Sequence, residues 1–411
     1  MKVTVVERRA KVVSSDEWLA ISTDSGFSDL VARDILNASI EKRGRGWRLN
    51  AGNHVGRALL GGVEVQIEEK VPGAFAAMVE ILAPAALKIA NAATPLVPGQ
   101  HPEEILVSLF LASSRSYLSG AKIFEYQTSG TTGAFVSGRL DVPRTIALRA
   151  RGTRHKVASK RTYLSDDVPL NRIVFAALGD VLANSQHTSL RPKFVATARA
   201  LRAAFTDAVQ PDPYVRRAEL IEIAIAEAEN AGRRREVQEV AALAGAILQA
   251  ASLSETATYQ GTAPRSWFLN LENFFERAVR HCARIELDGT AVVTGPILRP
   301  PLFSTLPHRY RANPDVVISS SGQTVLLDAK YKDLQVLPST QDIHELLAHA
   351  AAYNAERAAL IYPSESTFSV RPLGQSATGC ELWIFEINIV NLRKSIQEVL
   401  ATIGLLNRRS A

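Results

Sequence analysis

The sequence has little cysteine and no long apolar run. Its two cysteines, Cys282 and Cys380, are too few for a disulfide framework and form no CxxC pair, which argues against disulfide scaffolds and cysteine-based structural zinc sites. The first ten residues lack the apolar segment of a signal peptide, and the most apolar stretch, residues 74–87, is interrupted by a glutamate and a proline. We therefore expect a cytoplasmic protein that does not cross a membrane.

The sequence also lacks a GxxxxGK[ST] loop, so it has no evident nucleotide-hydrolysing site of its own. Its composition is otherwise ordinary for a globular protein, with 46% hydrophobic and 21% charged residues. The net charge of +6 weakly favours a polyanionic partner. The length of 411 residues predicts two to three domains, at roughly 100–200 residues per domain.

Three regions differ in local pattern and together predict a multidomain α+β protein. Residues 1–160 contain short β-prone segments with a helical insert, and the TSGTTG segment at 128–133 predicts a turn or flexible loop. Residues 161–255 are rich in alanine, leucine, glutamate and arginine at helical spacing, which predicts a helical region. Residues 256–411 alternate between strand and helix patterns, and we expect an α/β domain with a mixed sheet.

The most informative segment of the last region is a predicted β-hairpin with charged residues at its end. Asp315 begins one strand after Pro314, and Asp328 ends the next strand, followed two positions later by Lys330. Residues i and i+2 of a strand project to the same face, so Asp328 and Lys330 point together while Ala329 turns away. We expect the hairpin to bring Asp315 beside them, so that two carboxylates and one ammonium group converge.

This set of groups suits a hard divalent cation. Mg²⁺ prefers oxygen ligands and usually keeps several waters, and Mn²⁺ accepts the same ligands. Asp315 and Asp328 can supply two ligands and the backbone carbonyl of Ala329 a third, while Glu276 on the preceding helix can add a carboxylate to the metal or to its surroundings. Lys330 can orient an attacking water or stabilise the negative charge that develops on phosphorus.

The alternative interpretation is a strand that starts after a proline turn and an exposed Asp328–Lys330 pair at a strand end. The apolar runs 316–318 and 325–327 argue instead that both strands are buried. Buried strands whose ends carry convergent charges are more often functional sites than solvated faces. The order of an acid-bearing helix, a Pro-Asp strand, an Asp-x-Lys strand and a further helix is similar to the PD-(D/E)xK nuclease core.

Further segments resemble the McrC family, the nuclease subunits of McrBC-type modification-dependent restriction systems. They are GRLDVPRT from Gly138, LSDDVPLNR from Leu164, LENFFERAV from Leu271, DAKYK from Asp328, and residues 342–351 followed by LIYP from Leu360. The resemblance implies an N-terminal β-rich domain that docks on a hexameric ring of McrB, a GTP-hydrolysing AAA+ motor. It also implies a C-terminal PD-(D/E)xK domain that cleaves double-stranded DNA, while McrB recognises the modified site.

The helix that follows the Asp-x-Lys strand departs from the family pattern. The family often places a glutamine and then a tyrosine on this helix, and the corresponding positions here are Glu345 and His349. A glutamine role is therefore in doubt, although Glu345 can still face the metal. For both His344 and His349 we favour a place on the helix surface or in helix packing, because the two are poorly spaced for a zinc-binding pair.

A strongly basic run covers residues 139–161, with eight lysines or arginines against one acidic residue. Such a run can follow a phosphate backbone or face an acidic partner, and it can equally be a solvated loop. The resemblance favours contact with the McrB ring, or a stalk, for some of these residues. The candidates for DNA or partner contacts are Arg139, Arg144, Arg149, Arg151, Arg154 and Lys156.

Two smaller features complete the list of candidates. A predicted basic turn with Arg43, Arg45 and Arg48 flanks Trp47 and can reach towards a motor's GTP site, although basic loops are also common for solubility. Asn171 is expected to cap or pin the start of the helical region, and residues 166–167 are interpreted as acids that suit a helix N-terminus.

The sequence therefore supports a magnesium-dependent endodeoxyribonuclease that works with a separately encoded McrB-like GTPase and also stimulates it. The alternatives are a regulatory adaptor of an AAA+ motor with weak or no nuclease activity, and a PD-(D/E)xK nuclease that acts on another nucleic acid.

Overall fold

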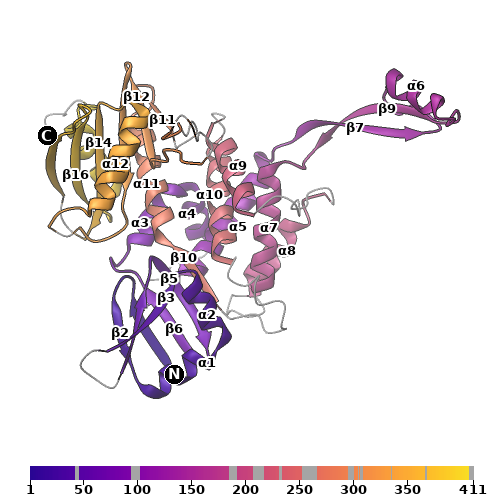
Figure 1. Ribbon diagram of the computed structural model, residues 1–411. Helices are drawn as coiled ribbons and strands as arrows, with labels where there is room; N and C mark the ends of the chain where they lie inside the picture. Colours follow the sequence, from indigo (N-terminus) through magenta and orange to yellow (C-terminus); the bar gives the residue numbers. More distant parts are fainter. Residues whose placement is uncertain are drawn as a thin grey trace. The chain divides into compact units, whose positions relative to one another are not determined.

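The computed structural model describes residues 1–406 except 42–45, 94–101, 185–191, 207–216, 231–233, 252–265, 295–299, 304, 306–308, 335 and 366–367. The chain forms two compact units (Figure 1). The first unit combines residues 1–105 with 250–411, and the second contains residues 106–249. This division differs from the predicted boundaries after residues 160 and 255, because the first and last thirds of the chain belong to one unit.

The N-terminal part of the first unit is β-rich, as its alternating apolar segments predicted. Its core is formed by buried valine, leucine and isoleucine side chains, with the partly buried Trp18, Phe27 and Trp47 packed against it. Its elements are β1 (Lys2–Val6), β2 (Ala10–Val13), α1 (Ser15–Thr23), α2 (Ser25–Ala32), β3 (Leu36–Ile40), β4 (Trp47–Ala51), β5 (His54–Leu60), β6 (Val63–Glu68), α3 (Ala74–Leu82) and α4 (Pro84–Ala93). Of the predicted basic turn, Arg43 and Arg45 lie outside the described residues, whereas Arg48 belongs to β4 and not to a turn.

A strand from the last third of the chain completes the N-terminal sheet. This strand, β10 (Ser266–Asn270), pairs antiparallel with β5 and gives the order β1-β6-β5-β10. Gly56 lies opposite Phe268, and a Cβ atom at Gly56 would approach the carbonyl oxygen of Trp267 to 2.0 Å. The glycine is therefore required for β10 to approach, and this pairing explains why the first unit is discontinuous in sequence.

The C-terminal part of the first unit is built on a six-stranded mixed sheet, as predicted. Its order is β11-β12-β13-β14-β16-β15, in which β14 pairs parallel with β13 and β16 and the other pairs are antiparallel. The elements are α11 (Leu271–Glu286), β11 (Val292–Thr294), β12 (Val316–Ser320), β13 (Gln323–Ala329), α12 (Thr340–Tyr353), β14 (Arg357–Ser364), β15 (Ser369–Gln375), β16 (Glu381–Asn388) and α13 (Leu392–Thr402).

Helices pack against this sheet and position the candidate site. Helix α12 contacts β13 and β14 through a core that includes Leu326, Leu346 and Leu360 (Figure 1). Helix α11 contacts β12 and β13, and it also packs against α13 and against α3 of the N-terminal part. The ends of β12 and β13 therefore lie next to residues of both α11 and α12.

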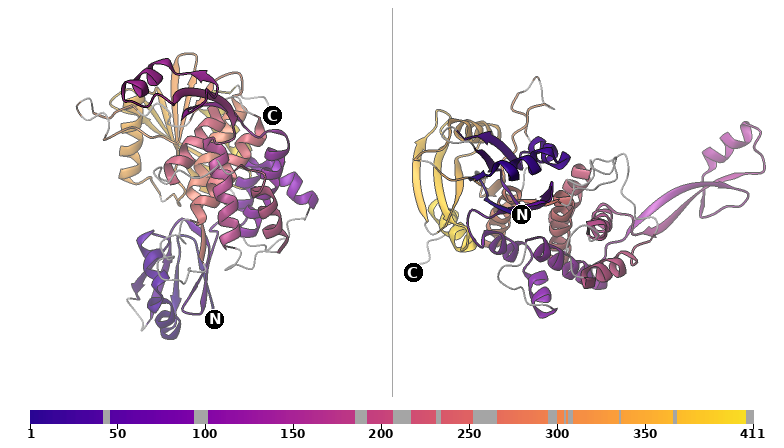
Figure 2. Two further views of the ribbon diagram at one scale, coloured as in Figure 1. Left: turned by 90° about the vertical axis from the view of Figure 1, so that its right-hand side faces the viewer. Right: turned by 90° about the horizontal axis from the view of Figure 1, so that it is seen from below.

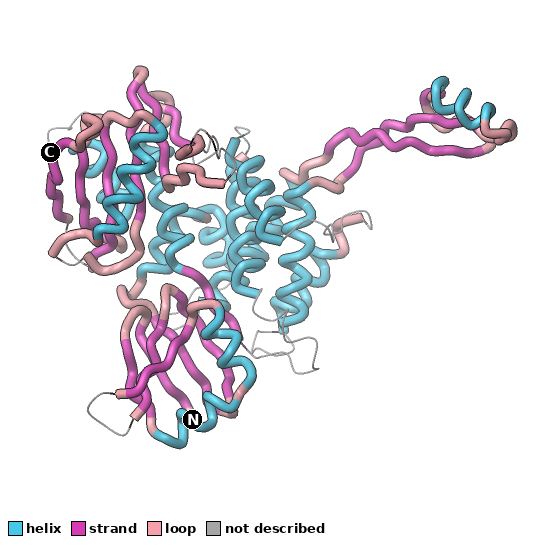
Figure 3. Tube along the Cα trace, in the orientation of Figure 1, coloured by secondary structure: helices cyan, strands magenta, loops and turns pink. Residues whose placement is uncertain are grey.

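The second unit is a helical bundle that carries a long β-ribbon (Figure 3). Its helices are α5 (Pro102–Gly120), which begins just before the boundary between the units, α7 (Pro169–Asn184), α8 (Pro192–Arg202), α9 (Arg217–Asn230) and α10 (Arg235–Ala251). Among the described residues, the predicted helical region 161–255 contains α7 to α10. Among the described residues, no helix is both long enough and apolar enough to span a bilayer.

The ribbon extends away from the helices in Figure 1 and in the right-hand view of Figure 2. We call it the arm; it consists of β7 (Glu125–Gly133), β8 (Arg139–Leu140), α6 (Val142–Ala150) and β9 (Val157–Ser165). The predicted turn at residues 128–133 is wrong, because these residues are part of β7 and pair with β9. The hydroxyl groups of Thr128 and Thr162 lie 3.0 Å apart across this pair, a contact that local sequence does not reveal.

Candidate active site

The structure brings the acids and the lysine of the predicted hairpin together. Val316 of β12 pairs with Leu327 of β13, so Asp315, directly before β12, lies across from Asp328. The Oδ2 atom of Asp315 accepts a hydrogen bond of 2.7 Å from the backbone N–H of Ala329. Two aspartates from two neighbouring strand ends therefore share one small volume.

Lys330 connects this volume to helix α12. Its Nζ atom lies 2.7 Å from Oδ2 of Asp328 and donates a 2.8 Å hydrogen bond to Oε2 of Glu345. Burial alone would lower the pKa of Lys330, but the Asp328 carboxylate outweighs burial and raises the pKa. The lysine therefore stays charged and is held in place by two carboxylates.

Glu276 joins the cluster from helix α11, one turn before Arg280. The Nε atom of Arg280 donates a 2.7 Å hydrogen bond to the backbone carbonyl of Asp315, which fixes the start of β12 against α11. Sequence reasoning missed Arg280, although its position four residues after Glu276 places both on one helix face. The helix thus supplies one carboxylate and one residue that positions Asp315.

The cluster carries more negative charge than its cations balance. Burial, followed by the nearby charges of Glu276 and Asp328, raises the pKa of Asp315 well above its usual range, and burial also raises the pKa of Asp328. Burial, together with the charge of Glu272, raises the pKa of Glu276 to about 7. Three carboxylates with raised pKa values form a site that attracts a cation or retains protons.

The donor atoms fit a divalent cation held by few protein ligands. Asp328 is buried, and from the described residues its Oδ2 atom accepts no hydrogen bond beyond the ion pair with Lys330. Across the described residues, no three His, Cys, Asp or Glu side chains are placed to hold a metal ion together. Mg²⁺ commonly uses one or two carboxylates and several waters, so Asp315 and Asp328 suffice for it. The roles of Ala329 and Glu276 as ligands stay predictions.

Helix α12 contributes the two residues that depart from the family pattern. Besides Glu345, which contacts Lys330, it places His349 with Nδ1 at 4.0 Å from Oδ1 of Asp328. His349 is buried, and burial lowers its pKa. The imidazole therefore packs in neutral form against the aspartate, which agrees with the expected packing role and adds a contact to the cluster.

A buried polar group supports the cluster from the N-terminal part of the unit. Tyr331, next to Lys330, is fully buried, and its ring lies 5.6 Å from the ring of Phe275. Its hydroxyl donates a 3.3 Å hydrogen bond to Oε2 of Glu7, at the end of β1, and Nζ of Lys70 lies 4.7 Å from its ring centroid. The sequence offered no signal for Glu7, because its partners are distant in the chain.

Glu7 predicts a pH dependence of stability. Burial raises the pKa of Glu7 from its usual value near 4.5 to about 7, although Lys70, Tyr331 and Arg8 oppose this. The folded state binds the proton of the Glu7 carboxyl group more tightly than the unfolded state does. The contribution of protonated Glu7 to the free energy of unfolding is therefore fully present below pH 4.5 and is lost as the pH rises to 7. The Glu7→Gln variant should therefore gain on the order of 3 kcal/mol of unfolding free energy at pH 8 and little at pH 4.

Tryptophan fluorescence during urea unfolding measures this effect, because all four tryptophans, at positions 18, 47, 267 and 383, lie in the first unit. The exposed Glu68 of the same sheet provides the matched control, and Glu68→Gln should change stability by less than about 0.5 kcal/mol at either pH. An equal gain for Glu7→Gln at pH 4 and pH 8 would contradict the assignment.

The basic residues predicted to contact DNA or a partner lie on the arm and are exposed. Arg139 is in β8, Arg144 and Arg149 are in α6, and Arg151, Arg154 and Lys156 lie between α6 and β9. They belong to the second unit, whereas the carboxylate cluster belongs to the first. Nearby exposed apolar side chains include Phe135, which is 87% exposed. The role of the basic residues as DNA or partner contacts stays a prediction.

Comparison with known proteins identifies the family. A family model described as a McrBC 5-methylcytosine restriction system component matches residues 49–363, which is most of the chain and includes both aspartates and Lys330. The chain therefore belongs to the McrBC family. No curated protein matches it significantly.

Two solved structures are similar at low identity. A half-complex of Thermococcus gammatolerans McrB AAA+ hexamers with bound McrC is 18% identical, with a TM-score of 0.47, and the match covers 98% of this chain and 100% of that chain. The Thermococcus gammatolerans McrBC complex is also 18% identical, with a TM-score of 0.38, and the match covers 70% of this chain and 88% of that chain.

Proposed function

We propose that this chain is the nuclease subunit of a McrBC-type restriction complex and cleaves phosphodiester bonds of double-stranded DNA with a divalent cation. The observation that carries the proposal is the convergence of Asp315, Asp328 and Lys330 at the ends of two paired strands. Membership of the McrBC family supports it. The site has the groups that phosphodiester hydrolysis needs: hard oxygen ligands and a fixed positive charge.

Asp315 and Asp328 would hold Mg²⁺ or Mn²⁺, which supplies an activated water and neutralises charge on the phosphate. The residues of the chain do the rest. Lys330, fixed by Asp328 and Glu345, presents a permanent positive charge to the phosphate or to the attacking water. Arg280 holds the backbone of Asp315, so that the two aspartates keep their spacing during the reaction.

We further propose a hexameric AAA+ GTPase as the partner, since the chain belongs to the McrBC family and its sequence contains no P-loop. The arm is the element of the chain best suited to contact it. It is long, carries six exposed basic candidates near its tip, and exposes apolar side chains such as Phe135. A basic and apolar projection can insert into an acidic-lined surface of a partner.

Charge reversal near the arm tip should weaken this contact. The double variant Arg149→Glu/Arg154→Glu is expected to reduce stimulation of the partner GTPase by roughly tenfold at low salt, because like charges replace attractive ones across the interface. GTP hydrolysis at increasing concentrations of the chain measures the effect. Arg199→Glu, at an exposed position of α8, should leave stimulation within about twofold. Equal losses in both variants would contradict a specific role for the arm.

A second candidate function is an adaptor that stimulates the motor without cutting DNA, and the exposed arm is the observation that favours it. The two functions are separated by incubating the full chain and its partner GTPase with methylated double-stranded DNA, GTP and Mg²⁺. Cleavage that stops on addition of EDTA supports the nuclease. Stimulated GTP hydrolysis with intact DNA supports the adaptor. The full chain is needed because residues 1–255 alone lack β10 of the N-terminal sheet.

A further inference from the structure

The root of the arm is the place where β7 begins and β9 ends, next to the helical bundle. Strands β7 and β9 pair from Glu125↔Ser165 to Gly133↔Val157, and the ribbon extends from the helices with many of its side chains exposed. A two-stranded ribbon without a packed face is only marginally stable in water and bends easily. The direction of the arm is therefore determined where its two strands enter the helical bundle.

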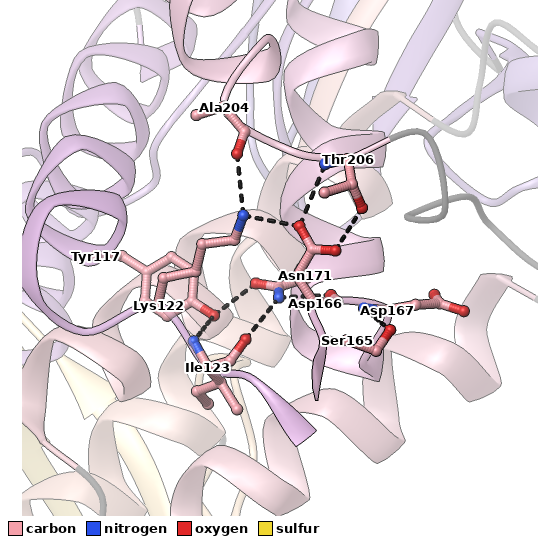
Figure 4. Close-up of polar contacts among 9 residues, drawn as sticks. All are labelled: Tyr117, Lys122, Ile123, Ser165, Asp166, Asp167, Asn171, Ala204 and Thr206. Carbon is pink, nitrogen blue, oxygen red and sulfur yellow. Dashed lines mark hydrogen bonds and ion pairs between the residues drawn. The ribbon is translucent and has the colours of Figure 1, made fainter. Parts of the chain in front are cut away.

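Asn171 lies at this root and joins three separate segments. It is fully buried in the first turn of α7, and its Nδ2 atom donates hydrogen bonds to the carbonyl oxygens of Ile123 (3.0 Å), before β7, and of Asp166 (2.7 Å), after β9 (Figure 4). Its Oδ1 atom accepts a 2.6 Å hydrogen bond from the hydroxyl of Tyr117 in α5. One amide group thus ties the outgoing strand, the returning strand and a bundle helix together.

The polar atoms of the Asn171 side chain all have hydrogen-bond partners. Both N–H bonds of the Asn171 side chain have an acceptor, its oxygen has a donor, and the Tyr117 hydroxyl also accepts a 3.1 Å hydrogen bond from the backbone N–H of Ile123. Buried networks in which each polar group is satisfied are rigid, because any movement leaves a group unpaired. Removing one member leaves buried polar atoms without partners, and each such atom then carries an uncompensated desolvation penalty.

Asp166 forms a second connection beside the first. Its Oδ2 atom is 2.8 Å from Nζ of Lys122, on the outgoing segment, and accepts a hydrogen bond from the N–H of Thr206 (3.2 Å), while Oδ1 accepts from the Thr206 hydroxyl (Figure 4). Lys122 also donates to the carbonyl of Ala204 at 2.9 Å. These hydrogen bonds, despite burial, lower the pKa of Asp166, so the pair remains charged.

These contacts give Asp166 a different role from the one predicted from sequence. Asn171 does pin the start of α7, as expected, but Asp166 does not act as a simple helix-start acid; it binds Lys122 and Thr206, which precede and follow the arm in sequence. A further bond of 2.7 Å joins the Gln127 side chain of β7 to the carbonyl of Asp167. Both strands are thus bound to each other and to α5, α7 and the segment after α8.

We propose that Asn171 and Asp166 form a buried clamp that fixes the direction of the arm relative to the helical bundle. A partner bound at the arm tip then contacts an arm that does not swing relative to the bundle. They are positioning residues, since they lie at the root and the predicted contacts lie near the tip. The rigidity of the root can be measured in the chain without its partner. Its consequence for GTPase stimulation rests on the proposed function.

Spin labels test the clamp without a partner. Arg161→Cys on the arm and Ala196→Cys on α8 are exposed, while the natural cysteines are buried and burial raises the pKa of Cys282 to about 12 and of Cys380 to about 11, so labelling is selective. The otherwise unchanged chain should give one narrow distance distribution. Asn171→Ala should broaden it, and Tyr117→Phe, which removes a single hydroxyl, should broaden it less.

Thr145→Val is the matched control, because Thr145 is buried at the arm tip and exchanges hydrogen bonds with the backbone of Ala158. It should leave the distribution narrow. A narrow distribution for Asn171→Ala with helical content retained overturns the clamp. If Asn171→Ala loses helical content, Tyr117→Phe decides by the same criterion.

The second measurement, on the unlabelled chain, is stimulation of the partner GTPase. Asn171→Ala should reduce it at least fivefold, with the arm-tip residues intact. Normal stimulation by a chain with a broadened arm would overturn the positioning role. Failure of the unsubstituted chain to stimulate any AAA+ GTPase would instead contradict the proposed function, while the spin-label result would still report on the clamp.

Discussion

The Lys330→Ala variant is expected to cleave DNA roughly 10³-fold more slowly than the unsubstituted chain, while the partner GTPase is still stimulated. The reason is that Lys330 is the cation that the structure fixes at the two aspartates, through a 2.7 Å ion pair with Asp328 and a 2.8 Å hydrogen bond to Glu345. Removing it takes away the charge that we propose to face the reacting phosphate, and it also leaves Asp328 with an uncompensated buried charge.

Single-turnover cleavage of methylated DNA, measured beside GTP hydrolysis, gives both rates. The matched control is Lys394→Ala, which removes an exposed lysine from α13 and should change neither rate by more than about twofold. Retention of full cleavage by Lys330→Ala, at normal GTP hydrolysis, would mean that the lysine is a structural ion pair and that the site lies elsewhere.

The largest expected effect on stability is that of Phe275→Ala. Phe275 is fully buried on α11, and its ring contacts the ring of Tyr331, one residue beyond Lys330. Removing it leaves a cavity beside Tyr331, between helix α11 and the end of the Asp-x-Lys strand, and such truncations cost about 3–5 kcal/mol. Urea unfolding followed by tryptophan fluorescence should therefore show a large loss in the first unit.

Phe135→Ala is the control for this variant, because the same side chain is 87% exposed on the arm. It should change the unfolding free energy of the first unit by less than about 0.5 kcal/mol. A loss below about 1 kcal/mol for Phe275→Ala would show that the ring is replaceable and that α11 is held mainly by other contacts.

The hairpin of the candidate site was predictable because its information is local. A strand has a period of two residues, and the tight turn between β12 and β13 fixes their register, so the position of Asp315 beside Asp328 and Lys330 follows from a short stretch of sequence. The mixed sheet of the C-terminal part was predictable for the same reason: its long helices and strands have strong periodic patterns. The proposed roles of these residues, and the metal they would hold, stay predictions.

The features that were not predicted depend on contacts between distant residues. The apolar residues of β10 lead directly into helix α11, so the sequence alone does not separate the strand from the helix. The strand forms because it pairs with β5, where Gly56 lies opposite Phe268. The segment 128–133 carries turn residues but is held in β7 by pairing with β9. Glu7 and Tyr331 are more than 300 residues apart, so no local pattern indicates their contact.

Asp315 and Asp328 are proposed to share one divalent cation that takes part in DNA cleavage. The decisive measurement compares the unsubstituted chain with Asp328→Asn, each with the partner GTPase, GTP, methylated DNA and Mg²⁺. The substitution keeps the shape of the side chain and removes one ligand charge. We expect cleavage to be lost while GTP hydrolysis continues. Equal cleavage by both proteins would contradict the shared cation site.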